Sequence, residues 1–282
     1  MITKNDIIRF LEDIEIMHDD TVLIHTSLKA IGGLDGGADM LIDAFCEYLY
    51  DGLFLIPTHT WDAVLPTQPF YDVKMTMPCI GTLPCIAVKR KDGVRSLHTT
   101  HSIMAFGKRA REYIRGEEMA TSPATVGGCW SRLYDEHAKI LLIGVGHDKN
   151  TYLHAIDEML NIPNRLREET YTITIRDEDG KLHTTPPFRG HYTKGISTCC
   201  SDFYPNYKKP LEELGAVTYA KLGDALVYRC DAVQCFHVIQ KLWEKTDHDL
   251  CTGEQEIPTA YYRRSTGSRA NDEDCCAVYK LT

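Results

Sequence analysis

The sequence lacks the short motifs that mark several large enzyme classes. No GxxxxGK[ST] segment is present, which argues against a P-loop ATPase, and no G-x-S-x-G segment is present, which argues against a hydrolase with a nucleophile elbow. The glycine-rich stretch GGLDGG (32–37) does not match G-x-G-x-x-G and lies too far beyond its strand for a dinucleotide-binding fold. The chemistry must therefore come from other residues.

No C-x-x-C spacing occurs among the eleven cysteines, although two adjacent pairs are present, Cys199 with Cys200 and Cys275 with Cys276. Adjacent pairs do not fit the usual ligand spacing of zinc sites, so no metal is expected. The opening MITKNDIIRF has no apolar core segment of the kind found in signal peptides. We therefore expect a cytoplasmic protein with reduced thiols.

Long apolar runs and an excess of positive charge are also missing. No run approaches the length of a membrane span, so we expect no membrane partner. The formal net charge is −9 over 282 residues, whereas nucleic-acid binding needs clustered cations, so we expect no nucleic-acid partner either. A cationic small molecule would be attracted to such a chain.

Strand and helix signals alternate along the first part of the chain. Apolar runs at TVLIH (21–25), LFLIP (53–57) and KILLIGVG (139–146) predict buried strands, with the last in the centre of the sheet. Helical patterns accompany them, for example at residues 150–160. Residues 58–80 carry aromatic residues and prolines without a period and are predicted to form a long functional loop.

The pattern changes after Glu169. TYTITIRD alternates with period two, and DEDG supplies a turn before KLHTT, which together indicate a hairpin. VTYAKLG and DALVYRCD suggest another strand pair, followed by a helix. We expect an α/β fold over residues 1–250, in which a mixed central sheet has helices on both faces and a smaller antiparallel, hairpin-containing lobe covers about residues 168–230. Residues 251–282 are expected to form a polar C-terminal tail.

Polar residues lie beside three predicted strands, where sites form in open α/β sheets. His25, Thr26 and Ser27 end the first strand, RSLHTTHS (95–102) precedes SIMAFG, and KILLIG runs into NTYLHAIDE (150–158). The hydroxyl groups and the nearby arginines suit phosphates or a pantetheine arm. The alternative is that the first two segments are only strand-end turns with hydroxyl caps.

His154 shares a predicted helix with two carboxylates. Asp157 follows it by three residues and Glu158 by four, so either carboxylate can lie on the same helical face. A carboxylate fixes the tautomer of a histidine and raises its basicity, which suits a general base. The alternatives are a surface ion pair and a structural histidine hydrogen-bonded in the core. Cys129 is a weaker candidate as a nucleophile, because no activating partner is evident.

Taken in order, these segments resemble the antibiotic N-acetyltransferase family, whose named members are aminoglycoside 3-N-acetyltransferases. The resemblance runs from about residue 4 to residue 250 and rests on VLIHTSLKAIGGLDGGADMLIDAF, LIPTHTWD, MPCIGTLPCIAVKRKDGVRSLHTTHSIMAFGKRA, KILLIGVGHDKNTYLHAIDE and SDFY. Several ordered motifs form a more specific signal than any one motif. The chain departs from the family pattern at Gly128-Cys129, where Ser-Pro is usual, at Thr99, where Pro is common, and at Asp157, where Glu is commoner.

The resemblance implies an acetyltransferase domain that passes the acetyl group of acetyl-CoA directly to the 3-amino group of a 2-deoxystreptamine aminoglycoside, which would confer antibiotic resistance. His154 would be the general base and Asp157 would orient it. The residues implied to line the acetyl-CoA side are His25, Thr26, Ser27, Arg95, His98, Thr99 and Ser102. The residues implied to hold the polycationic acceptor are Asp62, Glu158, Glu168 and Asp202.

Other readings of the same residues stay open. The chain could acetylate another amine, or it could be a non-catalytic relative that binds CoA. A metal-dependent hydrolase built on the histidines is a more distant reading. A homodimer is a candidate assembly.

Overall fold

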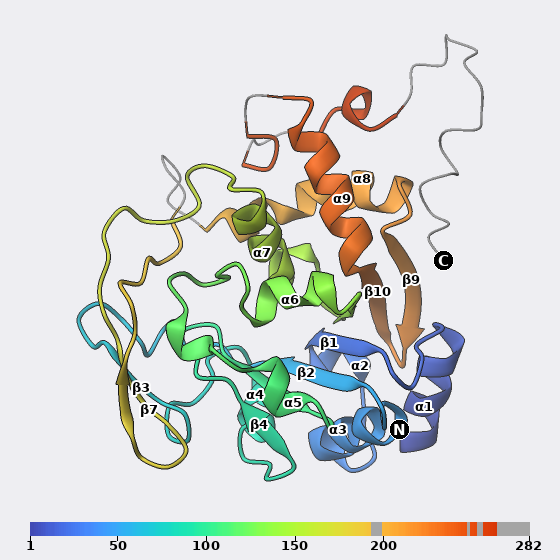
Figure 1. Ribbon diagram of the computed structural model, residues 1–282. Helices are drawn as coiled ribbons and strands as arrows, with labels where there is room; N and C mark the ends of the chain where they lie inside the picture. Colours follow the sequence, from blue (N-terminus) through green and yellow to red (C-terminus); the bar gives the residue numbers. More distant parts are fainter. Residues whose placement is uncertain (193–198, 247–248, 253–255, 264–282) are drawn as a thin grey trace.

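The computed structural model describes residues 1–192, 199–246, 249–252 and 256–263 (Figure 1). Its main sheet has seven strands in the order β4-β5-β2-β1-β6-β10-β9. In that order they are β4 (Gly93–Arg95), β5 (Ile103–Phe106), β2 (Leu53–Pro57), β1 (Thr21–Thr26), β6 (Lys139–Ile143), β10 (Ala225–Asp231) and β9 (Val217–Leu222). Both parallel and antiparallel pairs occur in it, so the predicted α/β fold with a mixed sheet is confirmed.

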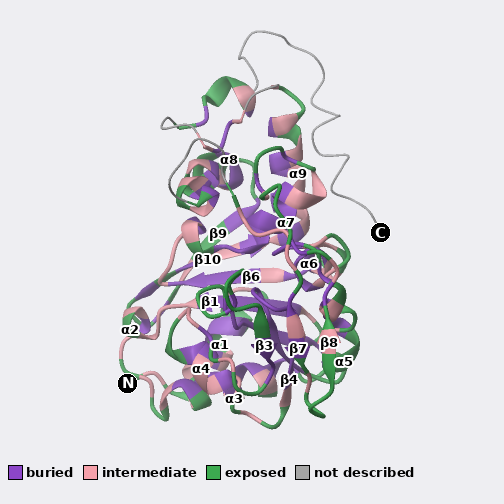
Figure 2. Cartoon of the chain, turned by 90° about the vertical axis from the view of Figure 1, so that its left-hand side faces the viewer, coloured by how far each residue is buried: buried purple, intermediate pink, exposed green. Residues whose placement is uncertain are grey.

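The three central strands β2, β1 and β6 run parallel to one another. Thr21 pairs with Leu53 on one side, and Thr26 pairs with Ile143 on the other. Parallel strands are covered on both faces, which explains their nearly continuous apolar sequences. Figure 2 shows β1 and β6 mostly in the colour of buried residues. Because these strands point the same way, their carboxyl ends meet at one edge of the sheet.

Helices pack on both faces of this sheet, as predicted (Figure 1). One face carries α1 (Lys4–Asp13), α2 (Leu28–Ile31), α3 (Gly37–Tyr48) and α4 (Thr82–Ala87). The other face carries α5 (Ala110–Tyr113), α6 (Cys129–Asp135), α7 (Tyr152–Met159), α8 (Lys208–Glu213) and α9 (Ala232–Trp243). Four 3-10 helices complete the described elements: η1 (Glu117–Met119), η2 (His147–Lys149), η3 (Cys200–Tyr207) and η4 (Thr259–Tyr261).

A second, three-stranded sheet lies beside the main one and has its own small core. Its strands are β3 (Phe70–Asp72), β7 (Thr174–Arg176) and β8 (Leu182–Thr184). β7 and β8 form the expected antiparallel hairpin, while β3 pairs with β7 in parallel. Tyr71, Ile175 and Phe188 are fully buried between them.

The extent of the predicted lobe needs correction. The strand pair expected within it, β9 and β10, belongs to the main sheet, because β10 pairs antiparallel with β6. The packed part of the chain also extends past residue 250, since Cys251, Ile257 and Tyr262 join the main core. Residues 264–282 of the predicted tail lie outside the described residues. Among the described residues, no helix combines the length and apolar character needed to cross a membrane.

The turn after β6 requires glycine at position 144. Gly144 has a φ of +67°, and a β-carbon placed there would lie 2.3 Å from the β-carbon of Ala30. We expect Gly144→Ala to lower the free energy of unfolding by about 2 kcal/mol or more, because it adds left-handed strain to a steric overlap. Gly180→Ala is the control, since Gly180 has a φ of +80° but no atom near its built β-carbon. Equal losses in denaturant titrations of the two variants would contradict the steric part of the argument.

Candidate active site

A cavity of about 850 Å³ opens where the parallel strands end. The ends of β1 and β2 form one wall, and residues 145–154, which follow β6, form another. The loop predicted to be functional contributes a third wall through His59, Trp61, Val64, Leu65, Pro66 and Ile80. Tyr171, Phe188 and His191 close the side toward the second sheet. A cavity of this size is typical of small-molecule sites.

His154 faces this cavity from α7 and is connected to Asp157 through a tyrosine. The hydroxyl of Tyr204 lies 2.7 Å from Nδ1 of His154 and donates to Oδ2 of Asp157 at 2.8 Å. Because its single proton goes to the carboxylate, the hydroxyl accepts a hydrogen bond from Nδ1–H. This arrangement leaves Nε2 of His154 as the unprotonated nitrogen.

Asp157 is buried and forms an ion pair with Arg165. Nε of Arg165 lies 2.7 Å from Oδ2 of Asp157, and its Nη1 lies 2.7 Å from Asp249. Burial raises the pKa of Asp157, but the charge of Arg165 and the Tyr204 hydrogen bond oppose the rise. Burial would lower the pKa of Arg165, yet its two carboxylates raise it above the usual value. The ion pair therefore fixes the carboxylate that holds Tyr204.

The neighbouring histidines around the cavity are neutral. Burial lowers the pKa of His25 to about 3. Burial, together with neighbouring histidines, holds the pKa values of His59, His101 and His191 well below the usual range. The ring of His191 lies 4.0 Å from that of His154, centroid to centroid. These rings therefore add aromatic surface and neutral polar atoms to the wall, not positive charge.

Two of the residues expected on the acetyl-CoA side line the cavity, namely His25 and Thr26. Nε2 of His25 accepts a hydrogen bond from the backbone N–H of Thr151 at 3.4 Å. Ser27 does not line the cavity, because its hydroxyl caps the short helix α2 by accepting from the N–H of Ala30.

The expectation for the second segment, residues 95–102, needs correction. Arg95 is buried, and its guanidinium donates to the carbonyl oxygens of Thr58, Val73 and Thr76 instead of facing the cavity. His98, Thr99 and Ser102 are also buried and absent from the lining. The lining residues of this segment are Thr100 and His101.

The expected acceptor carboxylates are not at the cavity wall either. Glu158 accepts hydrogen bonds from the hydroxyl of Ser122 and from the backbone N–H of Ala124, which lies 2.9 Å away. Asp62, Glu168 and Asp202 are exposed and outside the lining. The carboxylates that do line the cavity are Asp148 and Glu169, and two cations, Lys149 and Arg167, line it as well.

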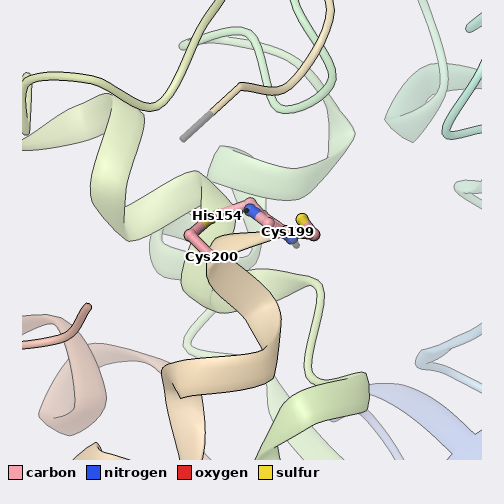
Figure 3. A group of neighbouring side chains, drawn as sticks. All are labelled: His154, Cys199 and Cys200. Carbon is pink, nitrogen blue, oxygen red and sulfur yellow. Dashed lines mark hydrogen bonds between the residues drawn. The ribbon is translucent and has the colours of Figure 1, made fainter. Parts of the chain in front are cut away.

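Cys129 does not have the environment of a nucleophile. It is fully buried in the main core, and burial raises its pKa well above the usual value. The thiols that lie near His154 are those of Cys199 and Cys200, at the start of η3 (Figure 3). Sγ of Cys200 lies 3.6 Å from Nδ1 of His154, and Cys199 lines the cavity.

Sequence reasoning missed Tyr204, although the signal was present. The SDFY segment (201–204) supplied Asp202 as a candidate because its charge is evident in the sequence. The 3-10 helix η3 instead buries Tyr204 completely and leaves Asp202 exposed.

We expect Tyr204→Phe to lower kcat about tenfold or more, because the histidine loses the hydroxyl that orients it. The loss should appear in kcat more than in the Michaelis constants, because Tyr204 does not itself line the cavity. Tyr207→Phe is the matched control, because its hydroxyl accepts from Trp243. A wild-type kcat in Tyr204→Phe would contradict an orienting role for its hydroxyl.

Comparisons with known proteins agree on one family. The profile of the family described as aminoglycoside 3-N-acetyltransferase matches residues 23–244. The chain is 25% identical over 240 residues to the aminoglycoside N(3)-acetyltransferase III of Serratia marcescens, with 79% of this chain and 87% of that protein covered.

Solved structures share the fold. The chain resembles AAC-IIIb in a binary complex with CoASH, with a TM-score of 0.72, 17% identity and coverage of 86% of this chain and 97% of that one. It also resembles AAC-VIa bound to sisomicin, with a TM-score of 0.69, 22% identity and coverage of 86% and 98%.

Proposed function

The chain belongs to the aminoglycoside 3-N-acetyltransferase family, and from this premise we propose that it transfers the acetyl group of acetyl-CoA to an amine, with His154 as the general base. The observation that carries the proposal is the hydrogen-bonded series His154–Tyr204–Asp157 at the wall of the cavity. Such a series holds the imidazole with one nitrogen free to accept a proton. Asp157 positions the imidazole of His154 indirectly, through the hydroxyl of Tyr204.

The reaction needs two successive proton transfers through His154 and no covalent enzyme intermediate. The amine nitrogen attacks the thioester carbonyl, so that a C–N bond forms while the C–S bond breaks. Nε2 of His154 takes the proton that the amine loses, and the proton then passes to the thiolate of CoA. Direct transfer of this kind requires both substrates in one cavity, and a volume of about 850 Å³ suits the reacting ends of the two molecules.

Unpaired polar atoms in the wall support a polar ligand beside His154. Oγ1 of Thr26 and the side-chain amide of Asn150 are buried and have no hydrogen-bond partner within the described protein. Both residues line the cavity. Buried polar atoms are costly without partners, and the amide and hydroxyl groups of a pantetheine arm would provide them. Thr26, Asn150 and the neighbouring His25 are therefore our candidates for contacting acetyl-CoA.

We propose a 2-deoxystreptamine aminoglycoside, acetylated at its 3-amino group, as the acceptor. The relative from Serratia marcescens is named an aminoglycoside N(3)-acetyltransferase, and the solved structure of AAC-VIa holds sisomicin. Asp148 and Glu169, which line the cavity, are the carboxylates that would meet the ammonium groups of such a substrate. They replace the four carboxylates that the sequence suggested.

A second candidate is an amine of lower charge. The two lining carboxylates are accompanied by Lys149 and Arg167, and Lys149 lies 2.9 Å from Asp148. A wall with balanced charge attracts a polycation less than an acidic wall does. The same base would serve either acceptor.

The test is release of thiol from acetyl-CoA in the presence of a panel of aminoglycosides and simple amines. Fast release with aminoglycosides, a Michaelis constant that rises with salt, and protection of a susceptible strain would support the first candidate. Release with singly charged amines alone would favour the second. Binding of CoA without release for any amine would contradict both and favour a non-catalytic relative.

A further inference from the structure

Three side chains of the types that bind metal ions lie together beside the cavity, and one of them is the proposed general base, His154. A ring nitrogen of His154 and the thiol sulfurs of Cys199 and Cys200 are all within 4.8 Å of one another. Figure 3 shows the histidine on α7 and the cysteines at the start of η3. Imidazole nitrogen and thiolate sulfur are the donors that Zn²⁺ prefers in proteins.

The distances within this group suit a small tetrahedral ion. With Zn–S near 2.3 Å and Zn–N near 2.0–2.1 Å, tetrahedral coordination places sulfur and nitrogen about 3.6 Å apart and two sulfurs about 3.8 Å apart. Sγ of Cys200 is already 3.6 Å from Nδ1 of His154. Cys199 is exposed, so its side chain has room to rotate over the distance that remains.

The three side chains are accessible to a cation from solvent. His154 and Cys199 both line the cavity, which provides a route for an ion from solvent. Thiols bind metal ions as thiolates, so a cation that binds here would displace the protons of both cysteines.

We propose that His154, Cys199 and Cys200 form a binding site for a thiophilic divalent cation such as Zn²⁺, whose occupancy reversibly blocks acetyl transfer. The block rests on the proposed function, because a histidine that donates its lone pair to a metal cannot accept a proton. If the ion binds Nε2, it occupies the base directly. If it binds Nδ1, it displaces the hydrogen bond to Tyr204. Three protein ligands leave a fourth position for water or the thiol of CoA.

Direct measurement of metal binding tests the site without any activity assay. The reduced full-length protein, stripped of metal, is titrated with Zn²⁺ against a chromophoric chelator. Co²⁺ then serves as a spectroscopic substitute, because tetrahedral thiolate coordination gives intense visible and charge-transfer bands. We expect one ion per chain at this site, and binding at least about tenfold weaker in Cys199→Ser and in Cys200→Ser.

The other adjacent cysteine pair provides the matched control. The double variant Cys275→Ser/Cys276→Ser removes two thiols with the same spacing and should leave the site's affinity and the Co²⁺ bands unchanged. If Zn²⁺ affinity and the Co²⁺ bands are the same in Cys199→Ser, Cys200→Ser and wild type, the site does not exist. His154→Ala should weaken binding as the cysteine variants do, and it should lose the nitrogen contribution to the Co²⁺ spectrum.

Inhibition is measured separately, against each variant's own rate without metal. Zn²⁺ should suppress thiol release in wild type, and a chelator should restore it. The zinc concentration giving half inhibition should rise at least about tenfold in Cys199→Ser, in step with the loss of affinity. Metal binding without inhibition would overturn the proposal that the ion blocks acetyl transfer, while the metal site itself would stand. Absence of acetyl transfer would overturn the proposed function and leave the binding result intact.

Discussion

Replacement of His154 by alanine is expected to lower kcat about 10²–10⁴-fold, the range typical of a lost general base. The loss should appear in kcat more than in the affinity for CoA, because His25, Thr26 and Asn150 are our candidates for that contact. Single-turnover thiol release and a CoA thermal-shift titration of the same preparation separate the two effects. A variant that retains more than a tenth of the wild-type kcat would contradict the assignment.

His191→Ala is the matched control for that experiment. Its ring lies 4.0 Å from that of His154, lines the same cavity, and has two buried nitrogens without partners in the described protein. Within the described part of the chain, no tyrosine links His191 to Asp157 as Tyr204 links His154 to it. We therefore expect a smaller loss of kcat in His191→Ala than in His154→Ala. The reverse order would transfer the role of base to His191.

The central sheet could be predicted because its signals are local. The apolar runs at 21–25, 53–57 and 139–146 carry their burial in their own composition, and strands β1, β2 and β6 follow them closely. The position of the strand pair β9–β10 could not be predicted in this way. A hairpin pattern fixes which strands pair with each other, but it does not say that β10 will also pair with β6. β3 was missed because its partner β7 lies about a hundred residues further along the chain.

The residues of the candidate site divide in the same way, into those with a local signal in the sequence and those without one. The spacing on one helix made His154 a candidate beside two carboxylates, and the resemblance to the family singled out Asp157. Tyr204 is 47 residues from Asp157 and reaches it only through the tertiary fold. Arg95 was assigned to phosphate because its charge is visible in the sequence. The sequence does not show that its guanidinium donates to the carbonyl oxygens of Val73 and Thr76. Long-range hydrogen bonding therefore decided which polar residues face the cavity.

Replacement of Arg165 by methionine is expected to cost about 3–5 kcal/mol of unfolding free energy, because it leaves the carboxylate of Asp157 buried without its cation. Asp157 and Arg165 are only 1% and 2% exposed, so solvent does little to compensate. Asp249→Asn is the control for the outer half of the network, since Asp249 is 27% exposed and its loss should cost less. Denaturant titrations of wild type and the two variants at neutral pH measure both losses of unfolding free energy.

The pH dependence of stability in Arg165→Met tests whether the unpaired carboxylate of Asp157 causes the loss of unfolding free energy. Burial already raises the pKa of Asp157, and removal of Arg165 should raise it further above its value in the unfolded chain. Between the pKa of Asp157 in the unfolded chain and its higher pKa in the folded variant, the folded variant binds a proton that the unfolded chain has released. Its stability relative to wild type should therefore fall as the pH rises through this interval and recover on acidification. The double variant Arg165→Met/Asp157→Asn should recover much of the lost stability at neutral pH, because asparagine keeps an acceptor for Tyr204 without the charge. A double variant no more stable than Arg165→Met would show that lost packing of the arginine, not the unpaired charge, is what destabilises the protein.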